Sequence, residues 1–182
     1  LLPSETSLAA GLGVSRPVIR EALKHLEGKG VVEIVNGKGT LVRPIDSDPL
    51  RRFFLRLTQM EQDSILELME IRRGLEVQAA TLAAQRKTPA DLEAMQKAVR
   101  AMRESMDDLD RFTQLDVEFH IAIAAASHNS ILVYLVESIR DALRDTIRAG
   151  LQSRGKRLDL ETIQQTHEAL LKALEESDID EA

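Results

Sequence analysis

Asp116 and His120 carry side chains that bind divalent metals in proteins, and they lie four positions apart in a segment with helical periodicity. Residues at this spacing share one face of a helix, so the carboxylate and the imidazole can reach the same ion. Phe112 and Phe119 indicate that this face is at least partly buried. His167, in the last predicted helix, can complete such a site across a helical bundle. A hydrogen bond or salt bridge between Asp116 and His120 explains the same spacing, so both interpretations stay open here.

Arg72 lies in the middle of a predicted helix among apolar neighbours. A buried guanidinium requires an anion, which is either the carboxylate of a ligand or an internal acid such as Glu76 or Asp141. For Arg72 the sequence favours neither. A further stripe of arginines at a spacing of four is explained better by internal salt bridges: Arg140, Arg144 and Arg148.

Arg16, Arg20 and Lys24 form a basic stripe along one face of a short predicted helix. Ile19 and Leu23 occupy another arc of the same helix, which can anchor it to a core. Arginine side chains presented in this way reach phosphates and guanine edges in the major groove of DNA. The stripe alone is more typical of a solvent-exposed helix face, but the tight turn before it and the Gly-rich hairpin after it favour DNA binding.

Sequence signatures of enzymes are scarce. The chain contains no Walker A loop, no GxGxxG after a strand, no GxSxG and no HExxH. The Glu-x-x-His pairs of di-metal helix bundles are also absent, because Val117 and Gln164 occupy the positions where Glu is required. We therefore expect no enzymatic activity. Two alternatives stay open: a metal-dependent helical enzyme with open coordination positions at Asp116, His120 and His167, and a metal-free ligand-binding or dimerisation scaffold.

The composition favours a soluble helical protein, since 43% of the 182 residues are hydrophobic and Leu and Ala dominate. The absence of cysteine excludes a disulfide framework, and no apolar run is long enough to cross a bilayer. We expect no membrane partner. The net charge of −6 is uneven: residues 1–44 carry six basic and four acidic groups, whereas residues 45–182 carry 18 and 26. A basic module attached to an acidic body indicates a polyanionic partner for the N-terminal part only.

Prolines and polar residues at 44–49 separate two stretches of different character and are predicted to form a linker. Residues 1–43 are predicted to form a winged helix-turn-helix domain. Its elements are a short helix capped by Ser4 and broken by Gly11 and Gly13, a second helix from Ser15 to about Gly28, and a hairpin around Asn36-Gly37. The first helix of such a domain is missing, so we expect the N-terminal end to be incomplete.

Residues 50–182 are predicted to form an all-helical antiparallel bundle, which makes the fold class mainly α. About six helices are expected. Five of them cover residues 50–57, 63–82, 108–126, 131–149 and 159–176, and one begins at residue 88. Ser177 and the acidic residues after it have the features of a helix start without a helix body. We therefore expect the C-terminal end to be incomplete as well.

Several motifs in the chain match those of a known family. In the N-terminal part they are Leu2-Pro3-Ser4-Glu5, Gly13-Val14-Ser15-Arg16, Arg20-Glu21-Ala22-Leu23 and Gly37-Lys38-Gly39-Thr40. In the helical part they are Glu70-Ile71-Arg72-Arg73-Gly74-Leu75-Glu76, Asp116-Val117-Glu118-Phe119-His120, Ser127-His128-Asn129 and His167. The first set resembles the DNA-binding domain of GntR-family bacterial transcription regulators. The second resembles the FCD effector domain of their FadR-like branch.

This resemblance implies a cytoplasmic bacterial homodimer that binds a short palindromic operator in double-stranded DNA. It implies a repressor that responds to a small carboxylate effector. The implied DNA contacts are Arg16 and Arg20 to bases, Ser15 and Pro17 to the adjoining backbone, and Asn36, Gly37 and Lys38 of the wing to the minor groove. Arg72 and Asn129 are the implied effector-binding residues.

Metal-binding members of the branch use one Asp and three His. Asp116, His120 and His167 match three of these ligands, and the fourth is expected beyond Ala182. The implied cofactor is a divalent transition metal, with zinc expected and nickel or manganese as alternatives.

Overall fold

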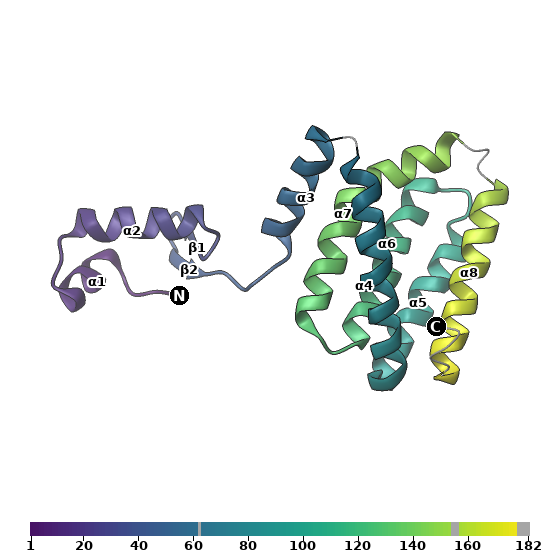
Figure 1. The fold of residues 1–182 in the computed structure, drawn as a ribbon. Coiled ribbons are helices and arrows are strands. Elements are labelled where there is room, and N and C mark those ends of the chain that lie inside the picture. Colours follow the sequence, from purple (N-terminus) through teal and green to yellow (C-terminus); the bar gives the residue numbers. More distant parts are fainter. Residues whose placement is uncertain (62, 154–156, 178–182) are drawn as a thin grey trace. The chain divides into compact units, whose positions relative to one another are not determined.

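The computed structural model describes residues 1–61, 63–153 and 157–177 of the 182. The chain divides into two compact units, Leu1–Pro49 and Leu50–Ala182. The described residues form eight helices and one two-stranded antiparallel hairpin (Figure 1). The predicted fold class, mainly α, is therefore confirmed. The expectation of a further helix starting at Ser177 concerns residues outside the described part.

The first unit begins with α1 (Glu5–Leu12). Ser4 fixes its start, because the Ser4 hydroxyl accepts a hydrogen bond from a backbone N–H of the first turn. Gly13 fixes its end by taking a left-handed conformation with a φ of 67°. The prediction that Gly11 breaks this helix was wrong. Gly11 lies inside α1, because one glycine costs a helix only about 1 kcal/mol and packing against the next helix offsets it.

The second helix, α2 (Arg16–Gly28), has Pro17 in its first turn and buries Ile19 and Leu23 in a small core shared with α1. Two strands follow, β1 (Val32–Val35) and β2 (Gly39–Val42), which pair in antiparallel register. Gly37 in their connection has a φ of 77°, a conformation that glycine adopts without steric cost. Two helices joined by a tight turn and followed by a hairpin form the predicted winged arrangement.

Six helices follow in the described residues: α3 (Asp48–Met60), α4 (Ser64–Arg86), α5 (Pro89–Glu104), α6 (Leu109–Ala126), α7 (Ser130–Ser153) and α8 (Arg157–Glu176). α3 begins two residues before the expected start at Leu50. Figure 1 shows α4 to α8 side by side, with consecutive helices running in opposite directions. α6 packs against α4, α5 and α7, and α8 packs against α4 and α5. This makes α6 the central helix of the bundle.

The core of the bundle explains why α6 is central. Large side chains on α6, among them Phe112 and Phe119, are almost fully buried. The facing side of α4 offers mostly alanines, from Ala79 to Ala84, which lets the two helices approach closely. Met95 and Met102 of α5 fill the remaining space. Asp116 and His120 lie on the same side of α6 as Phe112, so the packing of α6 holds them in fixed positions inside the bundle.

α5 begins with a complete capping box, as the sequence predicts. The Thr88 hydroxyl accepts a hydrogen bond from the Asp91 N–H, and the Asp91 carboxylate accepts one from the Thr88 N–H. We expect Thr88→Ala to lower the free energy of unfolding by about 1 kcal/mol in urea denaturation. Thr166→Ala is the matched control, because Thr166 is exposed within α8 and caps nothing. An equal loss in both variants would contradict a capping role.

The same cap predicts that the stability of the helical domain depends on pH. The hydrogen bonds from the Thr88 backbone and hydroxyl hold the pKa of Asp91 below its ordinary value. The stabilisation therefore exists above the pKa that Asp91 has in the unfolded chain, about 4, and is lost as the pH falls below it. The difference in stability between the wild type and Asp91→Asn should accordingly shrink in acid.

Candidate functional site

Three side chains from two helices converge inside the bundle. Asp116 and His120 lie on one face of α6, and His167 reaches them from α8. His167 Nε2 lies 3.0 Å from Asp116 Oδ1 and 3.1 Å from His120 Nε2. His120 Nε2 lies 3.9 Å from the same Asp116 oxygen. One carboxylate oxygen and two imidazole nitrogens therefore point at a common position.

This arrangement fits a divalent transition metal. Ligand atoms bound to one tetrahedral ion at roughly 2.0–2.2 Å lie about 3.3–3.5 Å apart, close to the three separations observed here. Nitrogen and oxygen donors of this kind suit zinc and its neighbours in the first transition row. Among the described residues, His167 Nδ1 is buried without a hydrogen-bond partner. A salt bridge alone does not account for two Nε2 atoms facing each other at hydrogen-bond distance.

Arg140 of α7 orients the carboxylate from the opposite side. Its guanidinium is only 3% exposed and donates to Asp116 Oδ2 at 2.7 Å through Nη1. Its Nε donates to the Glu76 carboxylate of α4. The two Asp116 oxygens are thus divided: Oδ1 faces His167, and Oδ2 is held by Arg140. Glu76 also lies 3.8 Å from His120 Nδ1 and so faces the imidazole edge away from the cluster.

The electrostatics of the cluster keep Asp116 and His120 deprotonated at neutral pH. Burial raises the pKa of Asp116, but the His167 hydrogen bond and the Arg140 charge lower it further, so it lies below its ordinary value. Burial and the Arg140 charge hold the pKa of His120 well below its ordinary value. At neutral pH the carboxylate is therefore charged and the His120 imidazole is neutral. These are the protonation states that metal binding requires.

Arg72 of α4 belongs to the same cluster. Its Nε lies 3.7 Å from Glu76 Oε1, and within the described part of the chain this Nε is buried without a hydrogen bond. Burial lowers the pKa of Arg72, and the Glu76 charge opposes this effect. A guanidinium remains charged in a protein even so. The cluster therefore combines two cations with two anions, and a divalent metal would give it a net positive charge that favours an anionic ligand.

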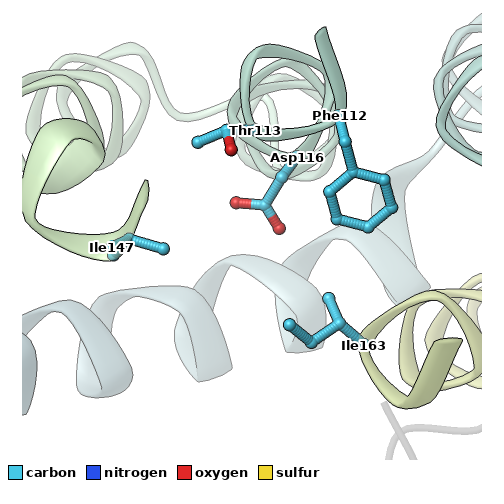
Figure 2. Close-up of a pocket in the computed structure, with 5 residues that line it drawn as sticks. All are labelled: Phe112, Thr113, Asp116, Ile147 and Ile163. Atoms are coloured by element: carbon cyan, nitrogen blue, oxygen red, sulfur yellow. The ribbon is translucent and has the colours of Figure 1, made fainter. Parts of the chain in front are cut away.

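A small cavity opens beside Asp116. Figure 2 shows the Asp116 carboxylate facing a space between Ile147 of α7 and Ile163 of α8, with the Phe112 ring at its side. The cavity has a volume of about 30 Å³, and Thr113 completes its lining. Its surface is almost wholly apolar. A polar cluster and an apolar cavity thus share one residue, Asp116.

The structure does not bring every predicted effector residue to this cluster. Asn129 lies at the turn between α6 and α7, where its side-chain oxygen accepts a hydrogen bond from the Leu132 N–H and caps α7. It follows Asp116 by 13 residues, about 20 Å along a helix. Of the other two arginines in the stripe on α7, Arg144 donates to Gln114 of α6 and lies 3.9 Å from Asp145. Arg148 pairs with Asp110. Only Arg140 of the three is fully buried, with 3% of its side chain exposed.

Arg140 and Glu76 are parts of the site that the sequence does not predict. The sequence identifies Glu76 only as a possible partner of a buried arginine, and Arg140 as one of three equivalent arginines. The available signal was the apolar surroundings of Arg140, since Val136, Ile139 and Leu143 of the same helix are buried. An arginine on the same arc as these residues must enter the core.

The predicted DNA contacts all lie on the surface of the first unit. Ser15 occupies the N-cap of α2, but its side chain makes no capping hydrogen bond, which leaves the hydroxyl exposed. Arg16 and Pro17 follow in the exposed first turn. Arg20 is 54% exposed and forms a salt bridge of 3.0 Å with Glu5. The turn residues Asn36, Gly37 and Lys38 are exposed at the tip of the hairpin.

A winged helix-turn-helix with a basic second helix, followed by a helical domain, defines a class of DNA-binding transcription regulators. The chain belongs to the gntR family of bacterial regulatory proteins: the model of that family matches residues 1–42, and the model of the FCD domain matches residues 67–182. Members of this family bind operator DNA through the N-terminal domain. None of the helices in the described residues contains a segment long and apolar enough for a bilayer.

Curated relatives extend this assignment. The HTH-type transcriptional regulator LutR of Bacillus subtilis (strain 168) is 31% identical over 95% of this chain and 80% of its own length. The Glc operon transcriptional activator of Escherichia coli (strain K12) is 32% identical over 84% of this chain and 62% of its own length. The HTH-type transcriptional repressor NanR of Cronobacter sakazakii is 33% identical over the whole chain and 70% of its own length.

Solved structures of other regulators are similar to this chain. Streptococcus agalactiae GntR has a TM-score of 0.77 and 29% identity, covering all of this chain and 82% of its own. Escherichia coli McbR/YncC, at 22% identity and a TM-score of 0.60, supports the fold. As a member of this family the chain is a transcription regulator, in agreement with the expectation that it is not an enzyme. The relatives include one named as an activator and one named as a repressor.

Proposed function

We propose that this regulator binds a divalent transition metal and a small carboxylic acid in its helical domain, and that the acid controls operator binding. The observation that carries this proposal is the convergence of Asp116 Oδ1, His120 Nε2 and His167 Nε2 on one position. Arg72, buried beside them, supplies a second positive group for an acid. Zinc is the expected metal, with nickel and manganese as alternatives.

Each residue of the cluster has a separate role in binding the metal or the acid. Asp116, His120 and His167 hold the ion, Arg140 fixes the orientation of Asp116, and Glu76 faces His120. When bound, the ion supplies positive charge and open coordination positions for carboxylate oxygens. Arg72 pairs with the acid, and the buried setting strengthens this attraction because water screens it little.

Control of DNA binding follows from the symmetry of a homodimer. Two copies place two α2 helices on a palindromic operator, and the half-sites require a fixed separation. The acid shifts the population of helical-domain conformations and thereby changes that separation. Arg16 and Arg20 contact bases, Ser15 and Pro17 contact the backbone, and Asn36, Gly37 and Lys38 enter the minor groove. The proposed direction is repression that the acid relieves.

Elemental analysis of the purified chain by plasma mass spectrometry tests the metal. We expect about one transition metal per chain in the wild type and none in the double variant Asp116→Ala, His120→Ala. The matched control is Asp145→Ala, His25→Ala, which removes the same two residue types at exposed positions. A metal-free wild type that also fails to bind added zinc would make Asp116 and His120 a structural pair, and the helical domain a metal-free scaffold.

The DNA contact has its own test. We expect Arg16→Ala to weaken operator binding by about 1–3 kcal/mol, roughly 5- to 150-fold, because a base-contacting arginine is lost. The measurement is a gel-shift titration against the operator and a scrambled duplex of equal length. Loss of discrimination between the two duplexes supports base contact. A uniform loss on both would instead assign Arg16 to the phosphates.

A further inference from the structure

We infer that Glu5 is a positioning residue for DNA recognition: it holds the guanidinium of Arg20 so that the N–H groups at its outer end are presented to a guanine in the major groove. The inference rests on the proposed function, because Arg20 must contact a base. It adds a residue of α1 to a recognition surface that otherwise consists of α2 and the hairpin. It also adds a source of specificity, since a guanidinium held in this way favours a base edge over a phosphate.

The Glu5 carboxylate occupies one edge of the Arg20 guanidinium. Arg20 Nη2 donates to Glu5 Oε2 at 3.0 Å, and Arg20 Nε donates to the same oxygen at 3.3 Å and to Oε1 at 3.4 Å. Nε and Nη2 form the side edge of the guanidinium. Its outer edge, made of one N–H of Nη1 and the second N–H of Nη2, takes no part in this pair. Parallel N–H groups of this kind match the O6 and N7 acceptors of guanine.

Glu5 is itself held in place by the start of α1. It is the first residue of that helix and directly follows the N-cap residue Ser4, whose hydroxyl accepts a hydrogen bond from the Ser7 N–H at 3.2 Å. An acidic side chain in the first turn is also favoured by the helix dipole. Because α1 and α2 share a small buried core, their packing fixes the position of Glu5 relative to Arg20.

The charge of Glu5 acts against binding to arbitrary DNA. The hydrogen bond from Arg20, and the charges of Arg20 and Arg16, lower the pKa of Glu5, so its carboxylate is ionised at neutral pH. This carboxylate repels the phosphates of a duplex, while the outer edge of the guanidinium still offers donors to a base. Both side chains are accessible, with 54% of Arg20 and 31% of Glu5 exposed. The pair therefore favours discrimination between sequences over affinity for any sequence.

The base preference of the full chain tests this inference. Operators are selected from a random double-stranded library with the wild type, and gel-shift titration without added acid then measures the affinity for each base at each half-site position. Arg20→Ala should lose the preference for guanine at one position. We expect Glu5→Gln, which keeps the size of the side chain and removes its charge, to reduce the preference at the same position by at least about fivefold. It should also bind a scrambled duplex more tightly than the wild type does.

Glu21→Gln is the matched control. Glu21 is 73% exposed on α2, and its carboxylate pairs with Lys24 at 3.1 Å. Removal of this charge should raise the affinities for the operator and the scrambled duplex by similar factors and leave every base preference unchanged. A merely structural role for Glu5 predicts weaker binding of Glu5→Gln to both duplexes, without a change in base preference. Equal changes of base preference in Glu5→Gln and Glu21→Gln would reveal a general effect of charge and overturn the positioning role.

Failure of this inference is distinguishable from failure of the proposed base contact. If Arg20→Ala loses a preference for guanine that Glu5→Gln keeps, Arg20 contacts the base without help from Glu5 and only the inference is overturned. If Arg20→Ala changes no base preference, the base contact and the inference are overturned together. The double variant Glu5→Gln, Arg20→Ala should lose no more preference than Arg20→Ala alone, because Glu5 acts through Arg20. Additive losses would contradict that dependence.

Discussion

Replacing Arg140 by methionine is expected to lower the free energy of unfolding by about 3–5 kcal/mol. The substitution keeps most of the side-chain volume but removes the cation that both Asp116 and Glu76 contact. Two carboxylates would then lie in the bundle without this partner, and a buried charge that loses its partner is strongly destabilising. Urea denaturation followed by the helical circular dichroism signal measures the change.

The control for this prediction lies one turn away on the same helix. Arg144 is 41% exposed, contacts Asp145 at 3.9 Å and donates a 3.3 Å hydrogen bond to the neutral Gln114, so Arg144→Met leaves no buried charge unpaired and should cost about 1 kcal/mol. The double variant Arg140→Met, Glu76→Gln should recover part of the loss, because it removes one unpaired charge. Equal effects of Arg140→Met and Arg144→Met would show that Arg140 does not hold the two carboxylates.

Removing the metal is expected to have an effect of similar size. A metal that binds only the folded chain stabilises it by about 4 kcal/mol when its free concentration is 1,000 times the dissociation constant. For a domain of this size the chelated protein should melt roughly 10 °C lower. Differential scanning calorimetry with zinc, and then with excess chelator, measures the shift.

The variants identify the source of that shift. The double variant Asp116→Ala, His120→Ala should melt at the same temperature with zinc and with chelator. The control Asp145→Ala, His25→Ala should respond like the wild type. If the melting temperature of the wild type is the same with zinc and with chelator, the proposed metal site at Asp116 and His120 is contradicted.

Local pattern was enough to predict much of the fold. The capping box at Thr88, the hairpin around Gly37 and the extent of α6 follow from a few neighbouring residues, and the structure has each of them. Gly11 shows where local pattern fails. Local pattern predicts a helix break at Gly11, but contact between α1 and α2 outweighs the cost of one glycine inside α1.

For the site, too, local pattern predicts some of the residues but not others. Asp116 and His120 share a helix face, so their proximity is a consequence of helix geometry alone. Arg140, Arg144 and Arg148 also share a face, yet spacing gives no means of choosing the one that turns inward. That choice depends on how α7 is rotated against α4 and α6, which is a property of the assembled bundle. Asn129 was predicted as an effector residue from its motif, but its side chain caps α7.

The polar cluster draws on four helices, with contributions that run from Arg72 on α4 to His167 on α8. Contacts between positions so distant in the chain close long loops and therefore carry a cost in loop-closure entropy. No fragment that lacks α8 contains the complete cluster. Binding of the proposed ion would therefore require that α8 has docked, and its occupancy would report the assembly of the last helix.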